Sequence, residues 1–164
     1  MHTNEQTLHR LYGAFAALDG ETMAQCYAED AQFDDEAFSL RGRTEVGGMW
    51  CMLCDGVKAR GRDVWKIETS GIQADAQSGQ AHWEATYRFS ATGRMVLNII
   101  DGQFTFTPQG LIATHRDRFD FWRWSRQALG MPGMLLGWTP LLRNKVRATA
   151  AANLKKYLAG KVAG

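Results

Sequence analysis

The 164-residue sequence has few of the residues that mark secreted, metal-binding or redox domains. It contains three prolines and three cysteines. An odd set of cysteines with no framework favours a reducing compartment over a disulfide-stabilised domain. Cys51 and Cys54 have C-x-x-C spacing, but they lie in an apolar helical stretch with no second pair. We therefore expect core packing for them, with no metal site and no cofactor.

Long apolar runs are also missing. No segment approaches the roughly 20 apolar residues that span a bilayer, and residues 1–5 have neither the basic start nor the apolar stretch of a signal peptide. These absences predict a cytoplasmic protein, and its length predicts one main domain.

Acidic residues are absent from residues 121–164, which hold eight lysines and arginines, whereas residues 1–120 hold 11 basic and 17 acidic residues. The overall charge of +2 therefore hides an acidic body and a basic tail. The tail cations are scattered and form no nucleic-acid-binding motif, so we expect no nucleic acid partner.

The sequence is rich in apolar and aromatic residues. Hydrophobic residues make up 45% of it, and they include 6 Trp, 4 Tyr and 8 Phe. Helical periodicity covers residues 7–18, 21–27 and a stretch after Thr44, which we expect to cap that helix. Strand patterns then cover residues 64–72, 81–89, 95–107 and 111–121. Helices followed by an antiparallel meander predict an α+β fold, with the helices on one face of a curved sheet.

The chain changes character at Gly130. We expect a domain over residues 1–130 and a basic helical tail over residues 131–164. Pro140 suits the first turn of a final helix, whose apolar stripe comprises Leu142, Val146, Ala150, Leu154 and Leu158. The tail is expected to pack over its own domain or on the acidic surface of a partner subunit. Contact with an anionic membrane surface is the less favoured alternative.

Asp101 attracts attention because it follows the apolar run from Met95 to Ile100. Period-two counting places it with Leu97 and Ile99, opposite Val96 and Ile100. Since both faces carry apolar residues, we expect the Asp101 carboxylate to be part-buried. It is then either paired, as a structural group, or kept protonated, as an acid in an apolar pocket.

Several strings resemble the nuclear transport factor 2-like superfamily, which includes ketosteroid isomerases, SnoaL-type polyketide cyclases and limonene epoxide hydrolases. They are Tyr27-Ala28-Glu29-Asp30-Ala31-Gln32-Phe33-Asp34-Asp35, Arg41-Gly42, Ile100-Asp101-Gly102-Gln103-Phe104 and Gly110-Leu111-Ile112. The resemblance spans about residues 7–122. It implies a cone of N-terminal helices packed on a strongly curved antiparallel sheet, with the C-terminal helical tail as an addition.

The resemblance to ketosteroid isomerases also implies site residues. Tyr12, Asp35 and Asp101 fall near the positions of the tyrosine, the base and the protonated aspartate of those enzymes. In ketosteroid isomerases an apolar site keeps that last aspartate neutral, so that it can donate a hydrogen bond. Two features depart from the pattern, because Glu36 stands where those enzymes have proline and the connection after Tyr12 is one residue shorter.

Further residues are assigned to the pocket. His82 and His115 are candidate acids or bases near neutral pH, and a satisfied histidine in the sheet is the alternative for each. Asp117 shares a strand face with His115, which we expect to contact Asp101. Trp50 completes the expected lining.

Together these residues predict a protein that holds a small apolar molecule. It would act without a cofactor as an isomerase or cyclase by acid/base chemistry, or bind a lipophilic ligand or a second copy without catalysis. An epoxide hydrolase-like activity, using Asp101, Asp117 and Arg116 or Arg118, is a further alternative. A homodimer is expected.

Overall fold

The N-terminal helices form where the apolar periodicity places them. The computed structural model describes residues 1–163. Helix α1 (Thr3–Ala16) buries its apolar stripe, including Leu8, Leu11 and Phe15. Helix α2 (Gly20–Gln25) begins after Asp19, whose side chain accepts a hydrogen bond from the backbone N–H of Thr22, which satisfies one free N–H of the first turn.

The third helix, α3 (Arg43–Arg60), starts differently from the expectation. Its N-terminal flanking residue is Gly42, with no side-chain hydrogen bond, so the prediction that Thr44 caps the helix is wrong. Gly42 has a φ of +88°, a backbone conformation that glycine adopts without the steric cost of a Cβ atom. The turn Arg41-Gly42-Arg43 therefore sets the start of the helix.

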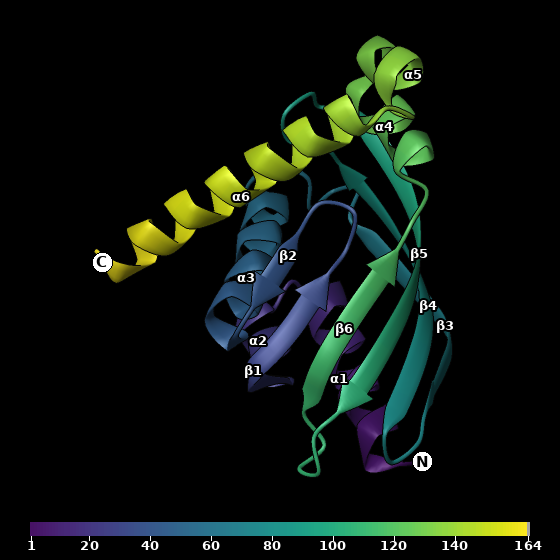
Figure 1. Cartoon of the computed structure of the whole chain (residues 1–164), viewed down its shortest axis with the longest axis vertical. Coiled ribbons are helices and arrows are strands. Elements are labelled where there is room, and N and C mark those ends of the chain that lie inside the picture. Colours follow the sequence, from purple (N-terminus) through teal and green to yellow (C-terminus); the bar gives the residue numbers. More distant parts are fainter. Residues whose placement is uncertain (164) are drawn as a thin grey trace.

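Six strands form one curved, open sheet in the order β2-β1-β6-β5-β4-β3 (Figure 1). Their bounds are β1 (Tyr27–Asp34), β2 (Ser39–Arg41), β3 (Lys66–Ala74), β4 (Ser78–Arg88), β5 (Met95–Phe106) and β6 (Ile112–Arg118). The expected α+β cone is confirmed. The sheet is mixed, however, because β1 and β6 pair in parallel while the other neighbours are antiparallel.

The three N-terminal helices pack on the inner face of this sheet. The main core combines their apolar stripes with inward residues of the strands, such as Phe33, Trp83, Ile100 and Phe104. Register shifts interrupt three of the strand pairs, and such irregularities bend and twist a sheet. The resulting curvature gives the sheet a concave side, which the helices cover.

The C-terminal part consists of α4 (Phe121–Leu129), α5 (Met131–Leu136) and α6 (Pro140–Val162). The last strand ends at Arg118, short of the expected Phe121, because Asp120 accepts a hydrogen bond from the N–H of Arg123 and starts α4. None of the helices described over residues 1–163 is long and apolar enough to cross a bilayer.

Helix α6 crosses α3 and contacts the loop between β1 and β2 (Figure 1). Val146, Ala150, Leu154 and Leu158, four residues of its predicted stripe, pack against the core clusters. Leu158 contacts α3 at Gly48, where a Cβ atom would collide with it. The tail thus packs on its own domain with this one face.

Candidate functional site

The centre of the site is a histidine–aspartate pair on β6. His115 and Asp117 are two residues apart on the strand, so both side chains point to the concave side. Their side chains are 0% and 3% exposed, and Nε2 of His115 lies 2.8 Å from Oδ1 of Asp117. A charged or strongly polar pair in an apolar core is expensive unless hydrogen bonds satisfy it.

Tyr27, itself hydrogen-bonded to Trp50, supplies the hydrogen bond on the histidine side. The Tyr27 hydroxyl lies 2.8 Å from Nδ1 of His115, and Nε1 of Trp50 donates to the same hydroxyl at 2.9 Å. Burial raises the pKa of Tyr27 well above its usual value, so its hydroxyl stays protonated and is able to donate a hydrogen bond to a neutral Nδ1. His115 then carries its own proton on Nε2 and donates to Asp117.

Asp117 has one committed oxygen and one free oxygen. Oδ1 accepts from His115 and, at 3.4 Å, from Nε1 of Trp83. No hydrogen bond from residues 1–163 reaches Oδ2. Gly102, opposite Asp117 on β5, makes room for the carboxylate, since an added Cβ would lie 2.9 Å from Oδ1.

Tyr12 brings a second unused polar atom to the same interior. Its hydroxyl is buried and has no hydrogen-bond partner among the described residues. The ring lies against Trp83, with centroids 5.9 Å apart. Burial, then the charge of Asp117, raises the pKa of Tyr12 well above its usual value. A neutral buried hydroxyl without a partner costs free energy, and a bound molecule with an acceptor atom would remove that cost.

Asp35 lies in the loop between β1 and β2. Its Oδ1 accepts the backbone N–H groups of Ala37 and Phe38 at 2.7 and 2.6 Å. The side chain is only partly exposed, and burial raises the pKa of Asp35 to about 7 despite those hydrogen bonds. The charge of Asp117 raises this pKa further, whereas Arg147 lowers it.

Helix α6 contacts the loop that carries Asp35. Nη1 of Arg147 donates to the backbone carbonyls of Asp35 and Glu36, both at 3.1 Å. Arg143 pairs with the Glu36 carboxylate at 3.5 Å. The tail therefore holds the Asp35 loop, and its arginine sets part of the electrostatic environment of that carboxylate.

The structure separates the sequence-predicted residues into two groups. Tyr12, Trp50, His115 and Asp117 lie inside the cone, and Asp35 lies close enough for its pKa to respond to Asp117. Asp101 and His82 lie on the outer face, where Oδ1 of Asp101 is 2.8 Å from Nδ1 of His82. The Asp101 side chain is 76% exposed.

The expectations for Asp101 are therefore wrong in three respects. It is not part-buried, does not face the interior and does not contact His115. Its strand neighbours Leu97 and Ile99 belong to the outer face, where apolar side chains often remain partly exposed. The hydrogen bond with Asp101 is the main reason that the pKa of His82 is raised.

The residue set offered for epoxide hydrolysis is divided in the same way. Asp101, Arg116 and Arg118 are exposed, while Asp117 is buried on the opposite face of the sheet. Residues two apart on a strand share a face and neighbours do not. These four residues cannot meet at one point.

Sequence reasoning did not assign roles to Tyr27, Trp83 or Gly102. The available signal was Gly102, because a glycine inside a regular strand often marks a place where another group approaches closely. Within residues 1–163, no group of three or more His, Cys, Asp or Glu side chains is arranged to hold a metal ion.

Solved structures with this architecture include proteins with several described activities. An epoxide hydrolase of M. tuberculosis, described as similar to limonene epoxide hydrolase, is 16% identical with a TM-score of 0.62, covering 82% of this chain and 96% of its own. A candidate polyketide cyclase from Silicibacter is 19% identical, with a TM-score of 0.59 and coverage of 76% and 93%. These similarities show the fold alone.

A protein from Catenulispora acidiphila with a ketosteroid isomerase-like fold, in complex with trimethylamine, is 13% identical. Its TM-score is 0.62, and the match covers 82% of this chain and 97% of its own. Among curated proteins, no sequence matches significantly. The model of the SnoaL-like domain matches residues 8–115, about two thirds of the sequence. The chain therefore belongs to the SnoaL-like domain family.

Proposed function

We propose that this protein binds a small, mainly apolar carbonyl compound inside the cone and transfers a proton on the carbon next to the carbonyl. The observation that carries this proposal is a pair of unused polar atoms in an aromatic interior. Oδ2 of Asp117 accepts no hydrogen bond from residues 1–163, and the Tyr12 hydroxyl has no partner there. One is a proton acceptor and the other a hydrogen-bond donor.

Asp117 is suited to the role of base because its other oxygen is held in place. His115 and Trp83 fix Oδ1, while Tyr27 and Trp50 fix His115. A preorganised group loses little freedom at the moment of reaction. When the carbon loses its proton to Oδ2, negative charge moves to the carbonyl oxygen, where Tyr12 would donate a hydrogen bond.

Asp35 is the second carboxylate of the proposal. A pKa of about 7 lets it hold or release a proton near neutral pH. It could return the proton to a different atom, as an isomerase requires, or act as the base itself. A ring-closing reaction would instead join the carbanion to a second carbonyl of the same molecule, consistent with a cyclase-like activity.

The proposal is tested by hydrogen exchange, because the exact substrate need not be known. A panel of apolar ketones, including a 3-keto-5-ene steroid and polycyclic β-keto esters, is incubated with the protein in D₂O. Deuterium at the carbon next to the carbonyl is followed by NMR. Asp117→Asn is expected to lower the exchange rate by about 10² to 10⁴, the usual contribution of a general base.

Asp35→Asn separates the two carboxylates, and Asp101→Asn is the matched control on the outer face. If wild type exchanges no ketone faster than buffer, the proton-transfer proposal fails for these substrates. Binding of a ketone without exchange, with affinity lost in Tyr12→Phe, would instead support the alternative of a non-catalytic lipophilic-ligand binder.

A further inference from the structure

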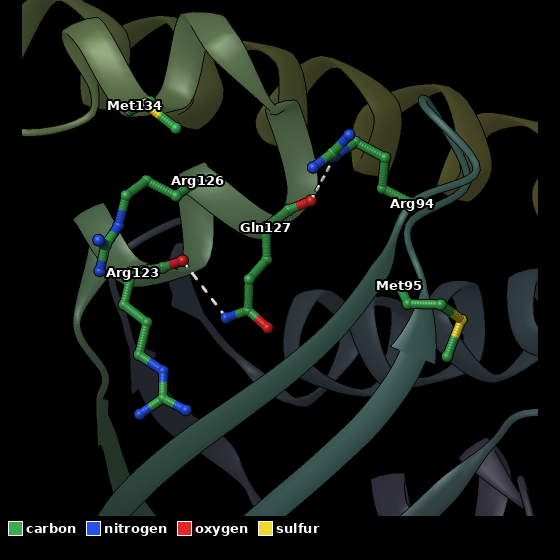
Figure 2. Close-up of a pocket in the computed structure, with 6 residues that line it drawn as sticks. All are labelled: Arg94, Met95, Arg123, Arg126, Gln127 and Met134. Carbon is green, nitrogen blue, oxygen red and sulfur yellow. Dashed lines mark hydrogen bonds between the residues drawn. The ribbon is translucent and has the colours of Figure 1, made fainter.

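A hollow lined by three arginines lies beside helix α4. Its volume is about 710 Å³, and Figure 2 shows Arg94 on one side and Arg123 and Arg126 on the other, with Gln127 between them. Met95 and Met134 complete the lining. We refer to it as the arginine hollow.

Two of the three arginines, Arg94 and Arg126, contact uncharged partners. Nε of Arg94 donates to the Gln127 carbonyl at 2.7 Å, and the Arg126 guanidinium lies 4.6 Å from the centroid of the Trp122 ring. The nearby Asp120 carboxylate accepts only the backbone N–H of Arg123 among the described hydrogen bonds. Within residues 1–163, none of the three guanidinium groups forms an ion pair with a carboxylate, so their charge is not neutralised there.

A cluster of exposed apolar side chains adjoins the hollow, and Met134 belongs to both. We call this cluster the apolar tip. Trp138 is 70% exposed and Leu141 is 74% exposed. The short helix α5 carries most of the cluster at one end of the molecule (Figure 1). Its members are Met131, Met134, Leu135, Leu136, Trp138 and Leu141. Exposed apolar patches rimmed by polar groups mark interaction sites.

We propose that the apolar tip and the arginine hollow together dock on an anionic lipid surface. The tip would enter the boundary between headgroups and acyl chains, where Trp and Leu are favourable. The arginines would bind headgroup phosphates, for which the planar guanidinium is suited. The complete absence of acidic residues from 121 to 164 leaves nothing in this segment to oppose an anionic surface.

A second copy of the chain is a less suitable occupant. A two-fold contact would place the tip of one subunit against the tip of the other. The three unpaired arginines of each subunit would then face those of its partner, and like charges in an interface disfavour binding strongly. An anionic lipid surface satisfies both the apolar and the cationic part of the same face.

The test is flotation of the full-length protein with two kinds of vesicle. One is phosphatidylcholine alone, and the other contains about 30 mol% phosphatidylglycerol, which supplies the negative surface charge. Binding to the anionic vesicles alone is expected, together with a fall in binding as salt rises from about 0.1 to 0.5 M. Equal binding to both vesicles, or binding to neither, would overturn the proposal.

Two double variants locate the surface. Arg123→Gln with Arg126→Gln, and Leu135→Ser with Trp138→Ser, are each expected to lower the vesicle partition coefficient about tenfold or more. Lys155→Gln with Lys156→Gln removes the same charge from exposed positions of α6 outside the tip, and Val162→Ser removes an exposed apolar side chain there. Both controls are expected to bind like wild type.

Fluorescence of Trp138 independently reports whether the apolar tip enters the lipid bilayer. A blue shift of tryptophan emission on adding anionic vesicles is expected for wild type and should be reduced in Trp138→Phe. Oligomeric state, measured by light scattering, distinguishes the other occupant. If Leu135→Ser with Trp138→Ser converts a dimer into a monomer while vesicle binding is unchanged, the tip is a contact between subunits and the proposal is wrong.

Discussion

Nδ1 of His115 lies 2.8 Å from the Tyr27 hydroxyl, although 88 residues separate them in the sequence. The parallel pairing of β1 with β6 brings the two strands together, with Tyr27 opposite Ile112 and Phe33 opposite His115. This contact fixes the ring of His115 and, through it, Asp117. Substitutions in this network, and of the polar groups outside it, should therefore have different and measurable effects.

Tyr27→Phe is expected to lower the free energy of unfolding by about 2–4 kcal/mol. It leaves Nδ1 of His115 and the N–H of Trp50 buried without partners, and each unsatisfied group costs about 1–3 kcal/mol. Tyr12→Phe is the matched control, because its hydroxyl has no partner to lose. We expect Tyr12→Phe to leave stability unchanged or to raise it by up to about 1–3 kcal/mol, because it removes a buried hydroxyl that has no partner. Urea denaturation compares the two, and equal losses would contradict the hydrogen-bond assignment.

Asp35 should make stability fall as pH rises from about 4 to about 7. Its pKa is about 7 in the folded protein, above the value of about 4 in an unfolded chain, so the folded state holds the extra proton in that interval. Because the Asp35 carboxyl ionises less readily in the folded state, raising the pH through this interval lowers the free energy of unfolding. Asp35→Asn keeps an oxygen that accepts the N–H groups of Ala37 and Phe38. It is expected to remove this pH dependence and to add about 1–2 kcal/mol at pH 8.

The pH dependence is measured by denaturation of wild type and Asp35→Asn across this range. The pKa of Asp35 is measured from the chemical shift of its carboxyl carbon. Arg147→Ala provides a second check, because Arg147 lowers the pKa of Asp35 and its removal should raise that pKa further. A wild-type stability that increases between pH 4 and 7, with no contribution from Asp35, would contradict the assignment.

Gly102→Ala should destabilise the protein by about 1–3 kcal/mol, the usual cost of overpacking. The new methyl group would lie 2.9 Å from Oδ1 of Asp117 and 3.0 Å from the ring of Phe104. Gly56→Ala is the control. It lies in α3 with nothing within 4 Å of the added atom, and alanine in place of an exposed helical glycine stabilises by about 0.5–1 kcal/mol. Thermal denaturation of both variants should show opposite signs.

Asp101→Asn is expected to leave stability and ligand binding unchanged, because an exposed pair contributes little. It should nevertheless lower the pKa of His82, whose rise comes mainly from the hydrogen bond with Asp101. Any stability that this pair supplies is present while His82 is protonated and is lost as pH rises through its folded pKa. NMR titration of the His82 ring measures the shift. A loss of ligand binding would contradict the outer-face position.

Most elements of the fold were predictable because their patterns are local. The apolar stripe of α1 and the alternation of β4 each appear within a dozen residues. The stripe from Val146 to Leu158 likewise predicted the buried face of α6. The parallel pairing of β1 with β6 has no comparable signal, since it joins segments far apart in the sequence.

The central pair of the site, His115 and Asp117, was predictable from the alternation of one strand. His115 and Asp117 share a face by simple alternation, and their contact at 2.8 Å agrees with it. Tyr27 and Trp50 could not be assigned to His115, because two successive hydrogen bonds that link three elements depend on how α3 and β1 pack against β6.

The sequence by itself determined the α+β class, the two faces of each long strand and the uneven distribution of charge. Only the tertiary structure decided which of those faces is inside. On β5, alternation along the backbone is enough to assign Val96, Ile100 and Phe104 to one face and their neighbours to the other. Asp101 is exposed and Asp117 is buried because the helices cover only the concave side of the sheet, and burial is settled by contacts between distant segments.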